Sequence, residues 1–312
     1  MKESPIKLFV IVVTYKGKQW YDRCFTSLRN STMPVQTIVV DNASNDGTVE
    51  YIKENYPEIH LIESKENLGF GKGNNVGISY AYEQGCDFVF LLNQDAWLDT
   101  DDVLEKLVDI SLRHPDYGIL SPVHLTVDKK EIEMSVEYGT NRYSAIMLSD
   151  LYCGTRKDVY ETNYASAVSW LLPRKTIQEV GGFNPMFQQY GEDDEYLNRV
   201  RYYGHKVGIC FGIDVIHDHQ KTNNPFSVSQ TRYYHNQALL ARLLDMNTGY
   251  DVALYRRYCL KKMVKMFVKG HMEESKQWFE DYKMIRKYSD QVKYYRSIMK
   301  RKKSVGLELM NC

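Results

Sequence analysis

Residues 88–95 read Phe-Val-Phe-Leu-Leu-Asn-Gln-Asp, an uninterrupted apolar run that ends in polar residues and a carboxylate. A run of this length predicts a buried strand. In an open α/β sheet, ligands bind just beyond the carboxyl ends of the strands. Asp95 is therefore predicted to lie where a hard cation and a diphosphate would be held. The alternative is an Asp that caps the following helix.

Three earlier segments have the same form, a short β-branched run that stops at polar residues. They are residues 8–13, 36–40 and 59–62. Helical patterns lie between them, and strands that alternate with helices predict a parallel sheet with right-handed crossovers. The polar strand ends would then gather along one rim, where a nucleotide would fit. These rim residues are Thr14, Tyr15, Asp41, Asn67 and Asp95.

The composition favours a folded protein of the reducing cytoplasm. The chain has 312 residues, 43% of them hydrophobic, which is enough for one large domain with a sizeable core. No apolar run approaches the roughly 18 residues of a membrane span, and charged residues interrupt the N-terminus, so a signal peptide is not expected. The six cysteines lack metal-site spacing and do not suggest a disulfide framework.

The formal net charge of zero conceals an asymmetry along the chain. Residues 251–312 hold 16 Lys and Arg against 7 Asp and Glu, so the preceding residues carry a matching excess of acid. We therefore predict a boundary near Gly249, with a body over residues 1–249 and a basic helical extension over residues 250–312.

Six motifs follow one another along about residues 6–222. They are VTY at 13–15, VVDNASNDGT at 39–48, NLGFGKGNNVG at 67–77, LLNQD at 91–95, GGFN at 181–184 and GEDDE at 191–195. In this order they resemble the family 2 glycosyltransferases, and most of all a bacterial rhamnosyltransferase-like branch. The resemblance implies the α/β fold called GT-A, which is Rossmann-like, with a mostly parallel central sheet flanked by helices. Here a C-terminal helical extension would follow it.

The same resemblance implies an inverting transfer of a sugar from a nucleotide-diphosphate donor, dTDP-rhamnose or a UDP-hexose. The acceptor would be a hydroxyl of a glycan or lipid-linked saccharide in surface polysaccharide synthesis. Residues 1–100 would bind the donor, and residues 101–249 would supply acceptor binding and catalysis. The implied donor contacts are Thr14, Tyr15, Asp41, Asn67, Gly69, Lys72, Asn75 and Asn93.

Several donor contacts have structural alternatives. Asp41 could bond the turn over residues 42–47, which is rich in turn formers, and Lys72 could be solvated. The glycines of residues 69–77 would let the backbone approach a ligand closely. A helix that starts near Asn74 would direct its positive end at an anion.

A metal site is the next implication. The family often has an Asp-x-Asp motif, but here Asn93 takes the first position, so only Asp95 supplies a charge. Mg²⁺ or Mn²⁺ would therefore keep several waters, depend on the donor diphosphate and neutralise the departing nucleoside diphosphate. The resemblance implies that a histidine here, His217 or His219, completes the metal site or contacts the diphosphate. Alternate residues of an extended segment point to opposite faces, so only one of them can face the site. We expect His217, with a structural histidine as the alternative.

The acidic motif at 191–195 supplies the predicted catalytic groups. In the resembling pattern Asp193 is the general base that takes the proton from the acceptor hydroxyl, and Glu192 supports it or binds the acceptor. Asp194 and Glu195 are predicted to be ordinary acids of a first helical turn. Trp170 is predicted to be a core residue, and the alternative is a contact between its ring and the acceptor sugar.

The basic extension predicts two helices. Apolar residues between 255 and 268 recur at helical spacing with basic residues mostly opposite, and a second helix is predicted over about 273–301. The charge could attract an anionic membrane surface, which would place the protein peripherally at the inner face of the cell membrane. Packing on the body or a homodimer contact is the alternative. No nucleic-acid motif accompanies the charge, so nucleic acid is not an expected partner.

Two other functions stay open at this point. A nucleotidyltransferase also binds a nucleotide on an α/β sheet, but residues 14–18 are a poor version of its glycine-rich basic signature. A non-catalytic nucleotide-sugar-binding protein would be expected to lack the base, and Asp193 is present.

Overall fold

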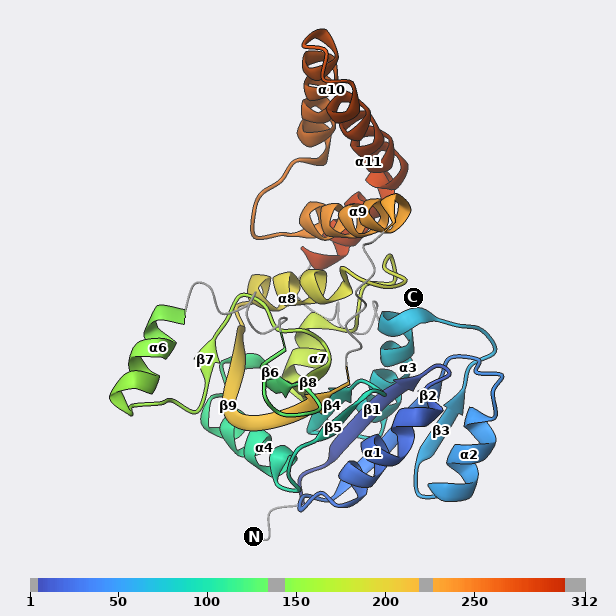
Figure 1. The fold of residues 1–312 in the computed structure, drawn as a ribbon, viewed down its shortest axis with the longest axis vertical. Helices are drawn as coiled ribbons and strands as arrows, with labels where there is room; N and C mark the ends of the chain where they lie inside the picture. Colours follow the sequence, from blue (N-terminus) through green and yellow to red (C-terminus); the bar gives the residue numbers. More distant parts are fainter. Residues whose placement is uncertain (1–4, 134–143, 219–226, 301–312) are drawn as a thin grey trace.

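A computed structural model describes residues 5–133, 144–218 and 227–300. Within them the chain forms a nine-stranded central sheet with helices on both faces, and a helical unit projects from one side of this body (Figure 1). The strand order is β3-β2-β1-β4-β8-β6-β9-β5, and β7 pairs with β9. The predicted α/β class with a mostly parallel sheet is confirmed.

The first half alternates strands and helices. Its elements are β1 (Leu8–Thr14), α1 (Lys18–Arg29), β2 (Val35–Asp41), α2 (Thr48–Asn55), β3 (His60–Glu63), α3 (Gly69–Glu83) and β4 (Phe88–Leu92). The four strands are mutually parallel. Their carboxyl ends therefore share one edge of the sheet, as the polar strand ends predicted.

The second half makes the sheet mixed. Its elements are β5 (Ala96–Leu98), α4 (Val103–Arg113), β6 (Tyr117–Leu125), α6 (Ser144–Cys153), β7 (Tyr160–Glu161), β8 (Ser169–Pro173), α7 (Arg174–Val180), α8 (Glu192–Tyr202) and β9 (Lys206–His217). Strand β8 runs antiparallel between β4 and β6, whereas β6 and β9 are parallel to each other. Strands β5 and β7 both pair antiparallel with β9.

Strand β1 shows how the sheet divides the core. Its even-numbered residues from Leu8 to Val12 pack in the same cluster as α1 and α4, and Phe9 and Ile11 pack with α3, α7 and α8. This is the period of two that places successive side chains on opposite faces. Trp170, predicted to be core, is fully buried and its ring stacks on that of Phe183.

Helix α3 begins at Gly69, five residues before the predicted start near Asn74. The reason is that its glycines pack against the protein. A Cβ at Gly73 would lie 2.8 Å from a Val13 methyl group, and one at Gly77 would lie 2.5 Å from Ile11 Cγ2. The glycine-rich segment therefore brings α3 close to β1, which the sequence does not distinguish from close approach to a ligand.

The helical unit comprises α9 (Val228–Leu244), α10 (Val252–Val268) and α11 (Met272–Met299). Helix α9 lies over α8, and α10 and α11 form a hairpin that extends away from the body (Figure 1). Residues of all three helices share one apolar cluster, to which Phe187 of the body contributes. Helix α9 thus packs with α11 although it precedes the predicted boundary at Gly249.

In the described part of the chain, no helix combines the length and the apolarity that crossing a bilayer requires. The described cysteines are all free thiols, and four of the five are buried.

Candidate active site

A pocket of about 580 Å³ opens where the carboxyl end of β4 faces the start of α8. It brings together five of the residues selected from the sequence, which are Asn93, Asp95, Glu192, Asp193 and His217. Residues of α9 line another side, so the helical unit completes the pocket wall. Distant segments of the chain therefore form a single acidic site.

Asp193 lies in the first turn of α8. The chain enters this helix through Gly191, whose φ of 85° is a left-handed conformation that suits glycine. The backbone N–H of Ala167 donates a hydrogen bond to Asp193 Oδ2 over 3.0 Å. Burial, reinforced by the negative charge of Glu192, raises the pKa of the Asp193 carboxyl well above its usual range. A carboxyl so placed can take up a proton more readily than an exposed one.

The neighbouring acids of α8 differ in their surroundings. Glu192 is buried, burial raises its pKa, and its Oε2 atom has no hydrogen-bond partner within the described residues. Asp194 is exposed. Glu195 is buried in an ion pair with Arg199, whose guanidinium also donates to the carbonyl oxygens of residues 180 and 182. Arg199, held by Glu195, thus ties residues 180–182 to α8. Glu195 was predicted to be an ordinary acid of a first helical turn, and its burial in this ion pair differs from that prediction.

Asp95 and His217 meet because β5 pairs with the end of β9, in a register that sets Ala96 opposite His217. His217 Nε2 lies 3.4 Å from Asp95 Oδ1, and His217 Nδ1 lies 2.8 Å from Glu133 Oε2. Burial lowers the pKa of His217, but the hydrogen bonds and charges of Asp95 and Glu133 outweigh it and raise the pKa to about 9. His217 thus faces the site as predicted, whereas His219 lies outside the described residues.

This arrangement resembles part of a cation site. A carboxylate that orients a histidine through one ring nitrogen, while the other nitrogen faces the ligand, is common around bound metals. Among residues 5–133, 144–218 and 227–300, no three His, Cys, Asp or Glu side chains form a ready-made metal cluster. Asp95 and His217 fit a cation that displaces the proton of His217 Nε2 and takes its remaining oxygen ligands from a substrate and from water.

The predicted donor residues lie on the neighbouring part of the strand edge. Asp41 is buried, and its carboxylate accepts hydrogen bonds from the Thr14 hydroxyl (3.2 Å) and from the Ser44 N–H (2.9 Å). The turn contact that was the alternative for Asp41 is thus present. Tyr15 is exposed, and the Gln94 side chain bonds both its N–H and its carbonyl.

Asn75 has a structural role in place of a ligand contact. Its amide donates to the carbonyl of Phe183 over 2.8 Å and accepts from the N–H of the same residue over 2.7 Å, and the side chain is buried. Both polar ends are therefore in use. Asn67 is exposed and accepts a hydrogen bond from the Gly69 N–H, and Lys72 is exposed on α3.

Sequence reasoning missed much of the pocket wall. Glu133 and Tyr164 come from connecting segments, and Tyr190 precedes the acidic motif. Tyr234 and Gln237 lie on α9, far along the chain from every motif. The only signal in the sequence was the large number of tyrosines, 25 in all, which does not predict which of their rings lie close together in the fold. The rings of Tyr190 and Tyr234 lie 4.6 Å apart between centroids.

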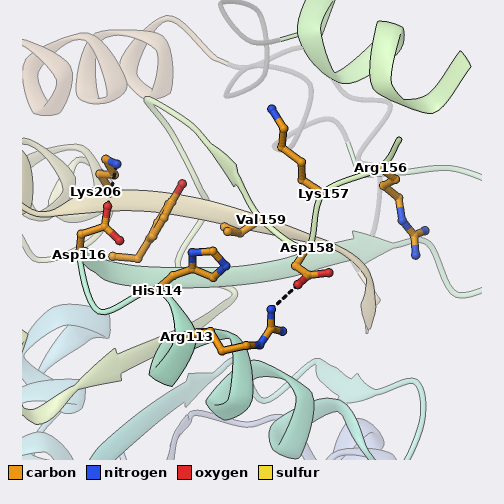
Figure 2. Close-up of a pocket in the computed structure, with 9 residues that line it drawn as sticks. Arg113, His114, Asp116, Arg156, Lys157, Asp158, Val159 and Lys206 are labelled. Carbon is orange, nitrogen blue, oxygen red and sulfur yellow. Dashed lines mark hydrogen bonds and ion pairs between the residues drawn. The ribbon is translucent and has the colours of Figure 1, made fainter. Parts of the chain in front are cut away.

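A second hollow of about 590 Å³ lies at the amino ends of β6 and β9 (Figure 2) and shares no lining residue with the acidic pocket. Its charged groups are largely paired with one another. Arg113 bonds Asp158, and Lys206 Nζ lies 2.7 Å from Asp116 Oδ2. Because it contains none of the residues with predicted catalytic roles, we do not assign the reaction to it.

Comparison with known proteins identifies the family. Residues 9–169 match the model of glycosyl transferase family 2, and the chain belongs to this family. It is therefore a glycosyltransferase of glycan or polysaccharide biosynthesis, and the nucleotidyltransferase and non-catalytic alternatives are set aside.

Two curated relatives and one solved structure illustrate the relationship. The low-salt glycan biosynthesis hexosyltransferase Agl10 of Haloferax volcanii is 26% identical over 72% of this chain and 69% of its own. The N-acetylglucosaminyl-diphospho-decaprenol L-rhamnosyltransferase of Mycobacterium tuberculosis is 23% identical over 77% of this chain and 85% of its own. The mannosyltransferase PcManGT of Pyrobaculum calidifontis, solved with GDP-Man and Mn²⁺, superposes with a TM-score of 0.56 at 18% identity, over 80% of this chain and 66% of its own. This last likeness supports the GT-A fold.

Proposed function

We propose that the protein transfers a sugar from a nucleotide-diphosphate donor to a hydroxyl of a glycan or lipid-linked saccharide, with inversion at the anomeric carbon. The observation that carries this proposal is Asp193, a carboxyl with a raised pKa in a pocket large enough for a sugar. A single displacement needs one base and no covalent nucleophile. The donors we favour are dTDP-rhamnose and UDP-hexoses.

In this mechanism Asp193 takes the proton of the acceptor hydroxyl as that oxygen attacks the anomeric carbon. The Ala167 N–H holds Oδ2 in place, which leaves Oδ1 for the hydroxyl. Glu192, with an unpartnered buried oxygen, would bind a second acceptor hydroxyl. The aromatic rings of Tyr164, Tyr190 and Tyr234 line the same pocket and suit the C–H faces of a sugar.

On the donor side we propose that Asp95 and His217, with Asn93 beside them, hold Mg²⁺ or Mn²⁺. The ion would neutralise the departing nucleoside diphosphate. Support comes from the pairing of Asp95 with His217 and from the orientation of that ring by Glu133. The Mn²⁺ bound by the mannosyltransferase of Pyrobaculum calidifontis agrees with this assignment.

The nucleotide would lie along the strand edge from Thr14 and Tyr15 to Asn67 and Gly69. Lys72, exposed on the first turn of α3, is our candidate for a phosphate contact. Asp41 keeps a proposed contact to the base or ribose, because a carboxylate can accept more hydrogen bonds than its two observed ones. Asn75 is left out, since its side chain is buried and both ends of its amide bond the backbone of Phe183.

The direct test is to incubate the full-length protein with a panel of radiolabelled nucleotide sugars and Mn²⁺, and to measure release of the nucleoside diphosphate. We expect one donor to be turned over, at least by slow hydrolysis, and Asp95→Ala to suppress that turnover. If no donor is hydrolysed or transferred although one of them binds by calorimetry, the catalytic proposal is wrong and the protein is a binding protein.

A further inference from the structure

Helix α10 has two apolar faces where the sequence predicted one. Val252 and Cys259 are buried against the rest of the helical unit. Six other large apolar residues of α10 are exposed to solvent, and we call the four nearest its carboxyl end the α10 stripe. They are Leu260 at 41%, Val264 at 50%, Phe267 at 60% and Val268 at 79% exposure. Their spacing of four, three and one residues places them on one side of the helix.

The charges around the α10 stripe are all of one sign. Helix α10 carries five Lys and Arg residues and no Asp or Glu. At 100° per residue, Lys261 and Lys265 fall beside the stripe. Within the described residues, none of the five cations forms an ion pair. Among the acids at the start of α11, Glu273 pairs with Lys276, and Glu274 Oε1 lies 3.7 Å from His271 Nδ1.

The position of the hairpin leaves this surface accessible. Helices α10 and α11 project from the body beyond α9 (Figure 1), and the cluster that joins the hairpin to the body uses the opposite face of α10. The α10 stripe therefore contributes little to the packing of the helical unit. An exposed apolar face of this kind marks an interaction surface.

We propose that α10 docks on an anionic lipid surface. The α10 stripe would lie at the boundary between headgroups and acyl chains, with Lys261 and Lys265 among the headgroup phosphates. This arrangement matches both the apolar residues and the unpaired cations. A two-fold contact with a second copy of the chain would cover the apolar residues but would leave the cations without partners. The same lysines of the two copies would lie opposite each other.

The proposal does not depend on the sugar or on the acceptor, and its test does not use enzymatic activity. The full-length protein is sedimented with phosphatidylcholine vesicles that contain or lack phosphatidylglycerol. We expect binding to the anionic vesicles only, and weaker binding at high salt. Val264→Ser combined with Phe267→Ser should lower the partition coefficient at least about tenfold, since two large apolar side chains no longer leave water.

Two further variants make the result specific. Leu112→Ser removes a similarly exposed apolar side chain from α4 of the body, at 58% exposure, and should leave binding unchanged. Lys261→Gln combined with Lys265→Gln should weaken binding to anionic vesicles and flatten its salt dependence. Circular dichroism and light scattering establish that each variant is folded and report its oligomeric state.

Three results would overturn the proposal. The first is a wild-type protein that stays in the supernatant at every anionic lipid concentration. The second is a folded Val264→Ser and Phe267→Ser variant that binds as well as the wild type. The third is a wild-type dimer that ignores vesicles and becomes monomeric in this variant, which would assign the α10 stripe to a second copy of the chain.

Discussion

The polar side chains on the donor side of the protein differ from those of the acidic pocket in how many of their hydrogen bonds are made within the protein. On the donor side, Asp41 at the end of β2 accepts two hydrogen bonds, and Asn75 of α3 bonds Phe183 through both ends of its amide. In the pocket, Glu192 Oε2 has no partner among the described residues, and burial raises the pKa of Asp193. Buried polar groups are normally paired. Those left unpaired here are available to a ligand, at a cost to the fold.

The largest expected effect is on the rate of transfer. Asp193→Asn should lower it by about 10²–10⁴-fold, because Asn cannot take a proton but still accepts the Ala167 hydrogen bond. Initial rates and calorimetric donor affinity should be measured on the same sample. Asp194→Asn, one residue further and exposed, is the matched control and should be mild. Equal rates for the wild type and Asp193→Asn would remove Asp193 from catalysis.

The next effect concerns the metal. Excess EDTA should abolish activity, and Asp95→Ala should do nearly the same because it removes the only charged ligand of the motif. Glu133→Gln should have a smaller effect, about 10–100-fold in metal affinity, because it acts through the orientation of His217. Titration with Mn²⁺ separates affinity from turnover. Full activity of the wild type in excess EDTA would show that the assignment of a metal to Asp95 and His217 is wrong.

Stability provides the third contrast. Asn75→Ala leaves the buried N–H and carbonyl of Phe183 without partners, so it should cost about 1–3 kcal/mol in urea unfolding. Lys72→Ala, on the exposed side of the same helix, should leave stability unchanged and weaken donor affinity. The comparison fails if Asn75→Ala is as stable as the wild type but binds the nucleotide less well.

The smallest effect is a dependence of stability on pH. Since burial raises the pKa of Asp193 in the folded protein, the folded state binds more protons than the unfolded one between the two pKa values. The free energy of unfolding therefore falls as pH rises through that window. Asp193→Asn has no proton to lose there, so its melting temperature relative to the wild type should rise with pH. The exposed Glu54→Gln is the control. A constant difference across pH would contradict the buried-carboxyl interpretation.

The sequence predicted the strands of the first half because each is a short apolar run closed by polar residues. It predicted that His217, Asp95 and Asp193 serve one site, and the structure places all three in one pocket. It did not predict Glu133 or Tyr234. Neither belongs to a motif. Glu133 reaches the pocket because its N–H bonds the carbonyl of His124 in β6, which runs beside β9, and Tyr234 reaches it through the packing of α9 on α8.

Two sequence interpretations changed for a common physical reason. The glycines of residues 69–77 permit close approach of the backbone, but their nearest neighbours are protein residues, Val13 and Ile11 of β1 for Gly73 and Gly77, and residues of the 183–188 segment for Gly69 and Gly71. The apolar positions of α10 fit one helical face, yet they divide between a buried side and the α10 stripe. Periodicity and residue type identify a contact surface. The tertiary packing decides what that surface contacts.

The most direct test of the central claim is the anomeric configuration of the product. Proton NMR of the first product formed, before it can equilibrate, reports whether the new glycosidic bond has the opposite configuration to the donor. A single displacement in which Asp193 deprotonates the acceptor predicts inversion. Retention of configuration would require a different mechanism and would contradict the role assigned to Asp193.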